Sequence, residues 1–166
     1  AGADIVNDIH GLRADPAMAN TVARYGAALV AMHNQRGREF HDVVGDIRAG
    51  FSESLGLAEA AGIDLGRIVL DPGFGFGWTP EQNLEMLRRL PELWDVEMPL
   101  LVGTSRKSTI GLVLDAPVEE RFEGTAASIA ASIAAGADIV RVHDVREMVR
   151  VARVADAIVR GNWRQR

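Results

Sequence analysis

Ala-Gly-Ala-Asp-Ile-Val occurs twice in this chain, at residues 1–6 and again at residues 135–140. The second copy follows a stretch of small residues that favours a helix and leads into an apolar run. Gly136 suits the position just past a helix end, because glycine adopts the left-handed conformation without a Cβ penalty. The motif therefore predicts a helix-to-strand joint in a protein of repeating β–α units. The first copy, which no Met precedes, predicts that the chain opens at the end of a helix it does not contain.

Five short apolar runs have the length of strands. They lack strict alternation of apolar and polar residues, which is typical of parallel strands covered on both faces. The runs cover residues 4–6, 28–32, 67–70, 100–102 and 139–142. Because helical segments separate them, the sequence predicts a parallel α/β architecture.

The helical segments carry recognisable start and stop signals. Asp15 and Pro16 provide a cap and a first residue for one helix. Thr79, Pro80 and Gln82 form a capping box with a proline at the first helical position. The expected helices are 17–25 closed by Gly26, 43–61 ended by Gly62, one beginning at Thr79, one from Pro117 to Gly136, and 145–159. No linker divides the chain, so a single domain over residues 1–166 is expected.

Composition excludes several classes of protein. The 166 residues carry a net charge of −5, which argues against a general nucleic-acid binder with a basic face. The absence of cysteine excludes disulfides and thiolate metal sites. No apolar run reaches the roughly 18 residues needed to cross a bilayer. We therefore expect a cytoplasmic protein with no membrane partner.

Polar residues follow each predicted strand. The strand C-termini of a barrel or a doubly wound sheet meet on one face, where ligands bind. A single polar tip is equally explained by capping, and Asp144 is as suited to an N-cap as to catalysis. Five in succession instead predict one site. The tips are Asn7-Asp8, His33-Asn34, residues 71–77, residues 103–108 and residues 141–144.

The segment Asp-Pro-Gly-Phe-Gly-Phe-Gly at residues 71–77 is the most constrained of these tips. Pro72 restricts Asp71 to extended geometry and so holds its carboxylate at the strand end. Three glycines allow tight turns, and two phenylalanines offer stacking surface. The spacing is not that of a P-loop or a dinucleotide fingerprint. A purely structural loop is the alternative interpretation.

Cations gather at the last two tips. Arg106 and Lys107 follow the fourth run, and Arg141 and His143 would point to the same side of the fifth strand. Placed above the start of the last helix, this pair suits a phosphate or pyrophosphate. A salt bridge to a neighbouring carboxylate is the alternative for Arg141. His10 and His41 lack partners at metal-ligand spacing and are expected at the surface.

Taken together, the motifs resemble the dihydropteroate synthase family. They are residues 6–9, Met32-His33, residues 71–77, Ser-Arg-Lys-Ser at 105–108, Arg121 with Gly124-Thr125, and Arg-Val-His-Asp at 141–144. The resemblance implies an eight-stranded TIM (β/α)8 barrel of which this chain supplies about five βα units, strands four to eight. It also implies a transferase of folate biosynthesis that joins 6-hydroxymethyl-7,8-dihydropterin pyrophosphate to p-aminobenzoate and releases pyrophosphate.

The resemblance assigns roles to individual residues. Asn7 and Asp71 would bind the pterin edge, with Met32 packed near the ring. Arg141 and His143 would hold the pyrophosphate, and Lys107 would contact the pterin and border the aminobenzoate pocket. That pocket would be formed by Gly75, Phe76 and Ser108. Lys107, Arg141 and His143 would be the catalytic residues. The family mechanism resembles an SN1 displacement in which pyrophosphate leaves before the arylamine attacks.

The chain also departs from the family pattern. Trp78 follows the glycine-rich segment and is expected to alter the entrance of the aminobenzoate pocket, and His10 replaces a common serine. The first three strands of the family have no counterpart; they carry the Asn that, together with the substrate pyrophosphate, would bind Mg²⁺. We therefore expect no metal ligand within this chain, a truncated domain with little or no activity alone, and a homodimer when complete.

Two other functions fit parts of the pattern. A related pterin-binding enzyme, such as a methyltetrahydrofolate methyltransferase, shares the Asn and Asp tips but has no evident use for the basic pair. A non-catalytic pterin-binding module or fragment, completed by another chain, is the second alternative.

Overall fold

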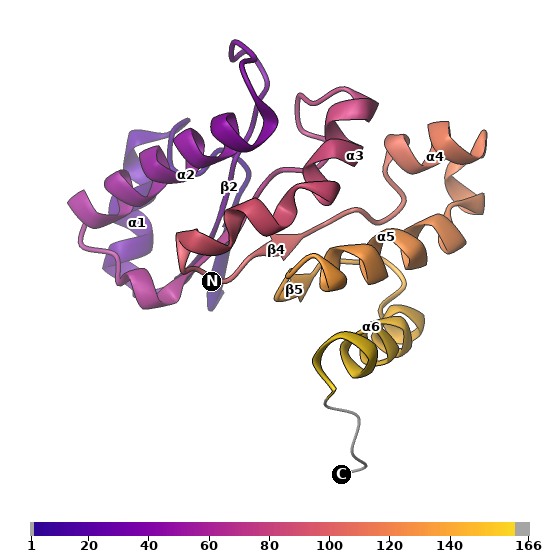
Figure 1. The fold of residues 1–166 in the computed structure, drawn as a ribbon. Coiled ribbons are helices and arrows are strands. Elements are labelled where there is room, and N and C mark those ends of the chain that lie inside the picture. The colour runs from indigo at the N-terminus through magenta and orange to yellow at the C-terminus, as the bar shows by residue number, and fades with distance from the viewer. Residues whose placement is uncertain (1, 162–166) are drawn as a thin grey trace.

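The computed structural model describes residues 2–161. Strands and helices alternate along the chain, as Figure 1 shows. The strands and α-helices are β1 Ile5–Asp8, α1 Pro16–Tyr25, β2 Ala28–Met32, α2 Val43–Ala60, β3 Ile68–Asp71, α3 Pro80–Arg88, β4 Leu101–Val102, α4 Ser108–Leu114, α5 Phe122–Ala134, β5 Ile139–Val140 and α6 Val145–Arg160. Three 3₁₀ segments join them: η1 Leu65–Arg67, η2 Leu90–Val96 and η3 Val118–Glu120.

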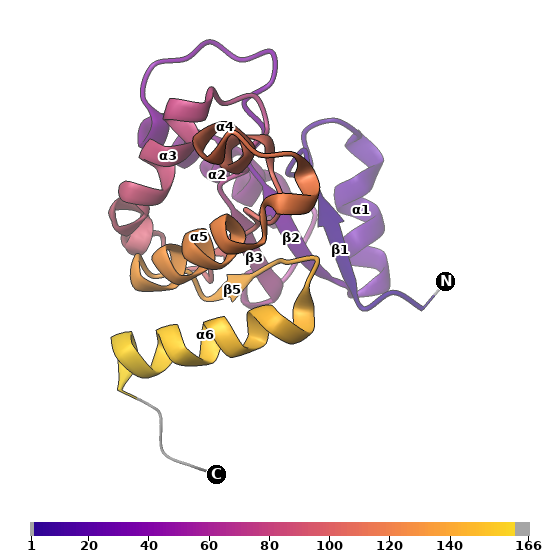
Figure 2. The same cartoon turned by 90° about the vertical axis from the view of Figure 1, so that its right-hand side faces the viewer.

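All strand pairs are parallel, which confirms the predicted α/β class. β2 lies between β1 and β3, and β4 pairs with β5. A single bridge between Leu70 and Leu100 connects the two groups of strands. Within residues 2–161, β1 pairs only with β2 and β5 only with β4, so the strands form an open array rather than a closed barrel. Figure 2 shows the helices around the outside of this array, with α1 beyond β1 and α6 beyond β5.

The main core lies between the strands and the helices that cover them. Leu29 of β2 and Leu70 of β3 have no exposed surface, and Ile47 and Phe51 of α2 are buried with them. Burying an aliphatic or aromatic side chain of this size contributes about 1.5–3 kcal/mol. A second, smaller cluster joins α5 to α6 through Ile129, Ile133, Met148 and Ala155.

Most of the predicted helix boundaries are confirmed. The Asp15 side chain accepts a hydrogen bond from the Ala17 amide, and Thr79 and Gln82 form the expected capping box. Gly136 follows α5 with a φ of +101°, in the region that favours glycine. The repeated motif is therefore a helix-to-strand joint at its second copy. In the first copy, Ala1 lies outside the described residues.

Four of the five strands differ from the prediction at one or both ends, and β3 is shifted by one residue while β4 begins one residue late. The first strand runs to Asp8, so Asn7 belongs to the strand rather than following it. The last strand ends at Val140, and Arg141 and His143 therefore lie beyond it. Its partner β4 is two residues long, and the amide of Arg141 makes the last bond, to the carbonyl of Val102.

The predicted helix from Pro117 to Gly136 is wrong at its start. Pro117 is extended and precedes the short η3, and α5 begins only at Phe122. The preceding helix α4 is not among the predicted helices; it is only seven residues long and contains Gly111, which weakens helix propensity. The Arg121 guanidinium lies where a Cβ on Gly111 would be, so a larger residue here would displace that side chain.

The described part of the chain has no helix that is both long and apolar enough to span a membrane.

Candidate functional site

The tips of three strands meet at one guanidinium. Arg141 Nη1 donates a hydrogen bond to Asn7 Oδ1 at 2.7 Å, and Arg141 Nη2 lies 3.8 Å from Asp71 Oδ2. The expected convergence is therefore confirmed for Asn7 in β1, Asp71 at the end of β3 and Arg141 just after β5. The alternative partner considered for Arg141, a neighbouring carboxylate, is present in this structure together with an amide partner.

Asp71 forms the buried floor of this junction. Only 2% of the residue is exposed, and its Oδ1 accepts a bond from the Gly73 amide at 2.8 Å. Burial raises the pKa of Asp71, while the Gly73 bond and the charges of Arg141 and Lys107 oppose that rise. The side chain thus presents oxygen acceptors at the base of a polar junction, here called the polar recess, which Asn7, Lys107 and Arg141 complete.

Lys107 approaches the same recess from the loop after β4. Its Nζ donates to the Phe74 carbonyl and lies 4.8 Å from the centre of the Phe76 ring. Burial lowers the pKa of Lys107 to about 8, Asp71 opposes this shift, and Arg141 adds to it. The amine therefore lies against a backbone carbonyl and an aromatic face, within the electrostatic influence of Asp71.

The glycine-rich loop packs too closely for any other residue. Gly73 has a φ of +78°, and a Cβ there would lie 1.9 Å from the His33 carbonyl oxygen. At Gly75, with a φ of +82°, a Cβ would lie 3.0 Å from Lys107 Cδ. The Asn83 side chain of α3 accepts a bond from the Gly75 amide at 2.6 Å. The loop is thus both tightly packed and part of the recess, and Asn83 is a supporting residue that no sequence motif indicated.

The loops after β4 and β5 are joined by side chains. Ser105 Oγ lies 2.9 Å from His143 Nδ1 and accepts a bond from the His143 amide. Arg106 binds both carboxylate oxygens of Asp144. Asp144 occupies the N-cap position of α6 but makes no capping bond, so a capping role for its side chain is wrong. Ser105 and Arg106 are neighbours in the sequence, as are His143 and Asp144. No other feature of the sequence indicated that these two segments bind each other.

The remaining predicted site residues differ in their surroundings. Met32 is 1% exposed, and its Cγ would lie 3.5 Å from a Cβ on Gly73, so it packs beneath the glycine-rich loop. Ser108 is exposed at the first residue of α4. Trp78 is buried against His33 and Phe40, and its effect on the aminobenzoate pocket stays a prediction. His10 is exposed at the surface, as expected.

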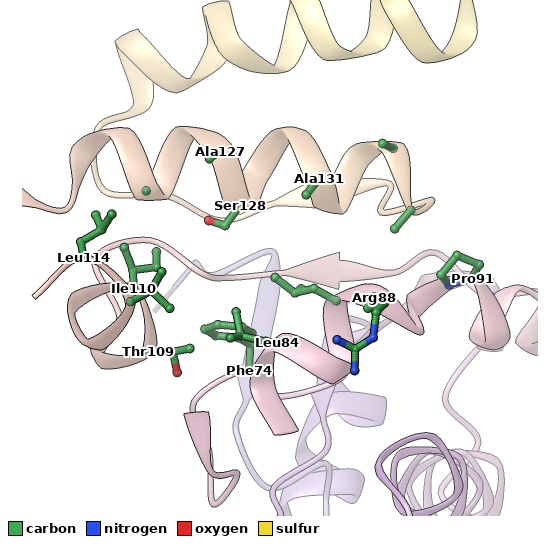
Figure 3. A pocket seen from close by; sticks show the side chains of 15 residues that line it. Phe74, Leu84, Arg88, Pro91, Thr109, Ile110, Leu114, Ala127, Ser128 and Ala131 are labelled. Carbon is green, nitrogen blue, oxygen red and sulfur yellow. The ribbon is translucent and has the colours of Figure 1, made fainter. Parts of the chain in front are cut away.

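A large cavity lies elsewhere, between α5 on one side and α3 and α4 on the other. It measures about 770 Å³, and Figure 3 shows Leu84, Ile110 and Ala131 among the side chains facing it. Among the described residues that line it, Arg88 alone is charged. An anionic substrate needs charged partners, which the polar recess provides and this apolar cavity does not. Phe74 connects the two regions, because its ring lines the cavity while its carbonyl binds Lys107.

The described residues 2–161 hold no group of three or more acidic or histidine side chains arranged to bind a metal ion.

The polar recess combines hydrogen-bond acceptors, two cations and an aromatic face. Such a set suits a planar ligand that carries both donor groups and negative charge.

Comparison with known proteins identifies related sequences and structures. The model of the family "Pterin binding enzyme" matches residues 1–143. The chain is 44% identical over 159 residues to dihydropteroate synthase of Bacillus subtilis, covering 96% of this chain and 56% of that protein. It is 39% identical over 163 residues to the Escherichia coli dihydropteroate synthase, covering 94% and 57%.

Solved structures agree with these relatives. A dihydropteroate synthase from Clostridium difficile, determined with pteroic acid, superposes with a TM-score of 0.92 at 48% identity and covers 96% of this chain and 61% of that one. The Yersinia pestis dihydropteroate synthase in a sulfonamide complex gives a TM-score of 0.90 at 36% identity, covering 97% and 61%. The chain thus spans roughly three-fifths of the length of these proteins.

Proposed function

This chain belongs to the family of pterin-binding enzymes, and on that premise we propose that it is part of a dihydropteroate synthase. The enzyme joins 6-hydroxymethyl-7,8-dihydropterin pyrophosphate to p-aminobenzoate, giving 7,8-dihydropteroate and pyrophosphate. The observation that carries this proposal is the junction of Arg141 with Asn7 and Asp71, beside Lys107. We further propose that the complete protein closes its parallel strands into a TIM (β/α)8 barrel.

In this proposal the pterin binds at Asn7 and Asp71. The aminopyrimidinone edge carries ring N–H and amino donors, and a carboxylate accepts two such bonds at once. Asp71 is held at the base of the recess by the Gly73 amide, so its free oxygen needs little reorganisation on binding. Met32 supports the floor from below.

The pyrophosphate is assigned to Arg141 and His143. A guanidinium offers several donors in a fixed plane, which matches phosphate oxygens. His143 lies two residues before α6, whose N-terminal amides favour a negative charge. Lys107 adds a second cation near the reacting centre.

The p-aminobenzoate is assigned to the surface formed by Gly75, Phe76 and Ser108. Phe76 presents a ring for the planar substrate, and Lys107 already lies near that ring. Ser108 begins α4, so its hydroxyl and the first amides of the helix are suited to a carboxylate.

Catalysis then requires positioning and charge stabilisation rather than a nucleophile from the protein. As pyrophosphate departs, negative charge grows on its oxygens, and Arg141, His143 and Lys107 stabilise it. The recess holds the two planar substrates in contact, which replaces a bimolecular encounter with a favourable orientation. The described residues do not form a metal site, so we propose Mg²⁺ only as a partner of the substrate pyrophosphate, and no step depends on it.

A hybrid enzyme tests the proposal. The hybrid joins residues 1–166 to the part of the Bacillus subtilis dihydropteroate synthase that this chain does not match. We expect the hybrid to form dihydropteroate and the isolated chain to show little or none. A folded hybrid that binds pterin equally well with and without pyrophosphate, and makes no dihydropteroate, would instead favour another pterin-binding function such as methyl transfer.

We also propose that the complete protein forms a homodimer and works in the cytoplasm. The absence of cysteine supports the cytoplasmic location.

A further inference from the structure

Two pairs of side chains connect the loops that follow β4 and β5. Ser105 Oγ bonds both the amide and Nδ1 of His143, at 3.2 and 2.9 Å. One position further along each loop, Arg106 Nε and Nη2 reach the two oxygens of Asp144, the former at 3.0 Å. The loops are thus bound together at consecutive positions rather than by a single contact.

The backbone of Arg106 is held just as firmly. Its φ of +57° lies in the left-handed region, which is unfavourable for a non-glycine residue. Its amide donates to the buried hydroxyl of Thr125 at 3.0 Å, and its carbonyl accepts from Arg121 Nη1 at 3.0 Å. Arg121 in turn bonds the Ala116 carbonyl at 3.2 Å. These contacts determine the direction in which the chain leaves Arg106.

Both members of the ion pair are next to residues of the recess. Lys107 follows Arg106, and His143 precedes Asp144. Yet the Arg106 side chain is 41% exposed, and within the described residues its only ion pair is with Asp144. An exposed pair of this kind contributes little to the free energy of unfolding, because water screens the two charges. Its effect is therefore expected in the geometry of the site rather than in global stability.

We propose that Arg106 and Asp144 form a positioning pair that fixes Lys107 and His143 relative to each other across the substrate recess. The two side chains bind each other, and we assign neither of them a contact with the substrates. The consequence for catalysis rests on the proposed function, whereas the effect on the position of Lys107 does not.

The position of Lys107 can be measured without any substrate. Burial lowers the pKa of its amine to about 8, and the charged groups that face it are Asp71 and Arg141. Competitive acetylation at a series of pH values, followed by peptide mass spectrometry, gives this pKa for the folded 166-residue chain. Releasing the loop exposes the amine to water, and its pKa then rises toward the ordinary 10.5.

We expect Arg106→Ala and Asp144→Asn each to raise the Lys107 pKa by at least about one unit. The exchanged pair Arg106→Asp with Asp144→Arg restores the opposite charges, and we expect it to return the pKa at least halfway; aspartate also tolerates the left-handed backbone. Arg48→Ala is the matched control, because Arg48 pairs with Asp95 on another part of the surface and its side chain is also 41% exposed. This control should leave the Lys107 pKa unchanged.

An unchanged Lys107 pKa in Asp144→Asn, with thermal unfolding like that of the parent, overturns the proposal. Failure of the exchanged pair to restore the pKa overturns it as well. Turnover of the hybrid enzyme tests the consequence for catalysis separately. We expect Arg106→Ala to lower kcat at least about tenfold, whereas Arg48→Ala should not. A shifted pKa with unchanged turnover keeps the positioning pair and rejects the role of Lys107 in the proposed function.

Discussion

Arg141 Nη1 lies 2.7 Å from Asn7 Oδ1, although the two residues are 134 positions apart in the chain. The contact joins the tip of the first strand to the loop after the last one. Arg141 therefore touches residues assigned to the pterin while it is itself assigned to the pyrophosphate. Its guanidinium is the physical link between the two halves of one substrate.

Replacement of Arg141 by alanine tests this link in the hybrid enzyme. Loss of charge-assisted hydrogen bonds costs about 1.5–3 kcal/mol, which corresponds to roughly 10- to 100-fold weaker binding of pterin pyrophosphate. We expect pterin without pyrophosphate to be affected much less. Isothermal titration with both ligands measures the difference, and equal losses would contradict the assignment to pyrophosphate. Arg141→Lys should recover only part of the affinity, since it lacks the planar fork.

Replacement of Asp71 by asparagine separates binding from stability. Burial raises the pKa of Asp71 above its ordinary 3.8, so folding favours the protonated carboxyl. That contribution is present at acid pH and is lost as the pH rises through the raised pKa. The substituted amide does not titrate and so has no such loss, and its Oδ1 can still accept from the Gly73 amide. We expect Asp71→Asn to unfold at a higher temperature than the parent at about pH 7, with a smaller gap at about pH 4.

The same variant should bind pterin at least about tenfold less tightly, because an amide nitrogen cannot accept a bond from a ring donor. Binding that stays at the parental level, with the expected gain in stability, would remove Asp71 from the pterin site.

The buried side chain of His33 leads us to expect that the fold becomes less stable at acid pH. Its Nε2 bonds Gln35 Oε1 at 2.8 Å, while the Gln35 amide nitrogen donates to the Glu39 carbonyl and to Asp46. Gln35 Oε1 is thus an acceptor, and Nδ1 of the buried ring has no partner within the described residues. Burial lowers the pKa of His33 from 6.5 to about 4, so the neutral ring stabilises the fold above pH 6.5. That stabilisation is lost as the pH falls toward 4.

We expect the free energy of unfolding from urea titrations to decrease by up to about 3 kcal/mol between pH 6.5 and pH 4 through this residue. His33→Gln keeps a donor for Gln35 and should remove much of this dependence. The exposed His10, which has no ion pair within the described residues, provides the control, and His10→Gln should leave the dependence as it is. A pH dependence that is the same in all three proteins would exclude His33 as its source.

Substitution of Gly73 tests how tightly the glycine-rich loop is packed. Gly73→Ala introduces a Cβ 1.9 Å from the His33 carbonyl oxygen in addition to a strained backbone. Gly37 has a similar φ of +73° but nothing within 4 Å of the added atom. We expect Gly37→Ala to cost about 1 kcal/mol, from backbone strain alone, and Gly73→Ala about 3 kcal/mol or more. Urea unfolding measures both, and equal costs would show that the clash is relieved by movement of the loop.

Local signals predicted much of the fold. The caps at Asp15 and Thr79 and the glycine at Gly136 depend only on residues within a few positions, so the sequence sufficed to place those boundaries. The ends of β5 and the helix α4 were not predicted correctly. The length of β5 depends on its partner β4, which is only two residues long. The helix α4 contains Gly111, and the side chain of Arg121, from beyond the end of this helix, fills the space beside that glycine.

The sequence by itself determined the chemistry of the recess, because strand tips in a parallel sheet converge whatever the details of packing. Asn7, Asp71, Lys107 and Arg141 followed from their places after apolar runs. Only the tertiary structure decided which of them touch and how they are held. The contacts of Arg141 with Asn7, and of Arg106 with Asp144, join segments far apart in the chain. Such contacts depend on the register of several strands and on loop geometry, which no local pattern encodes.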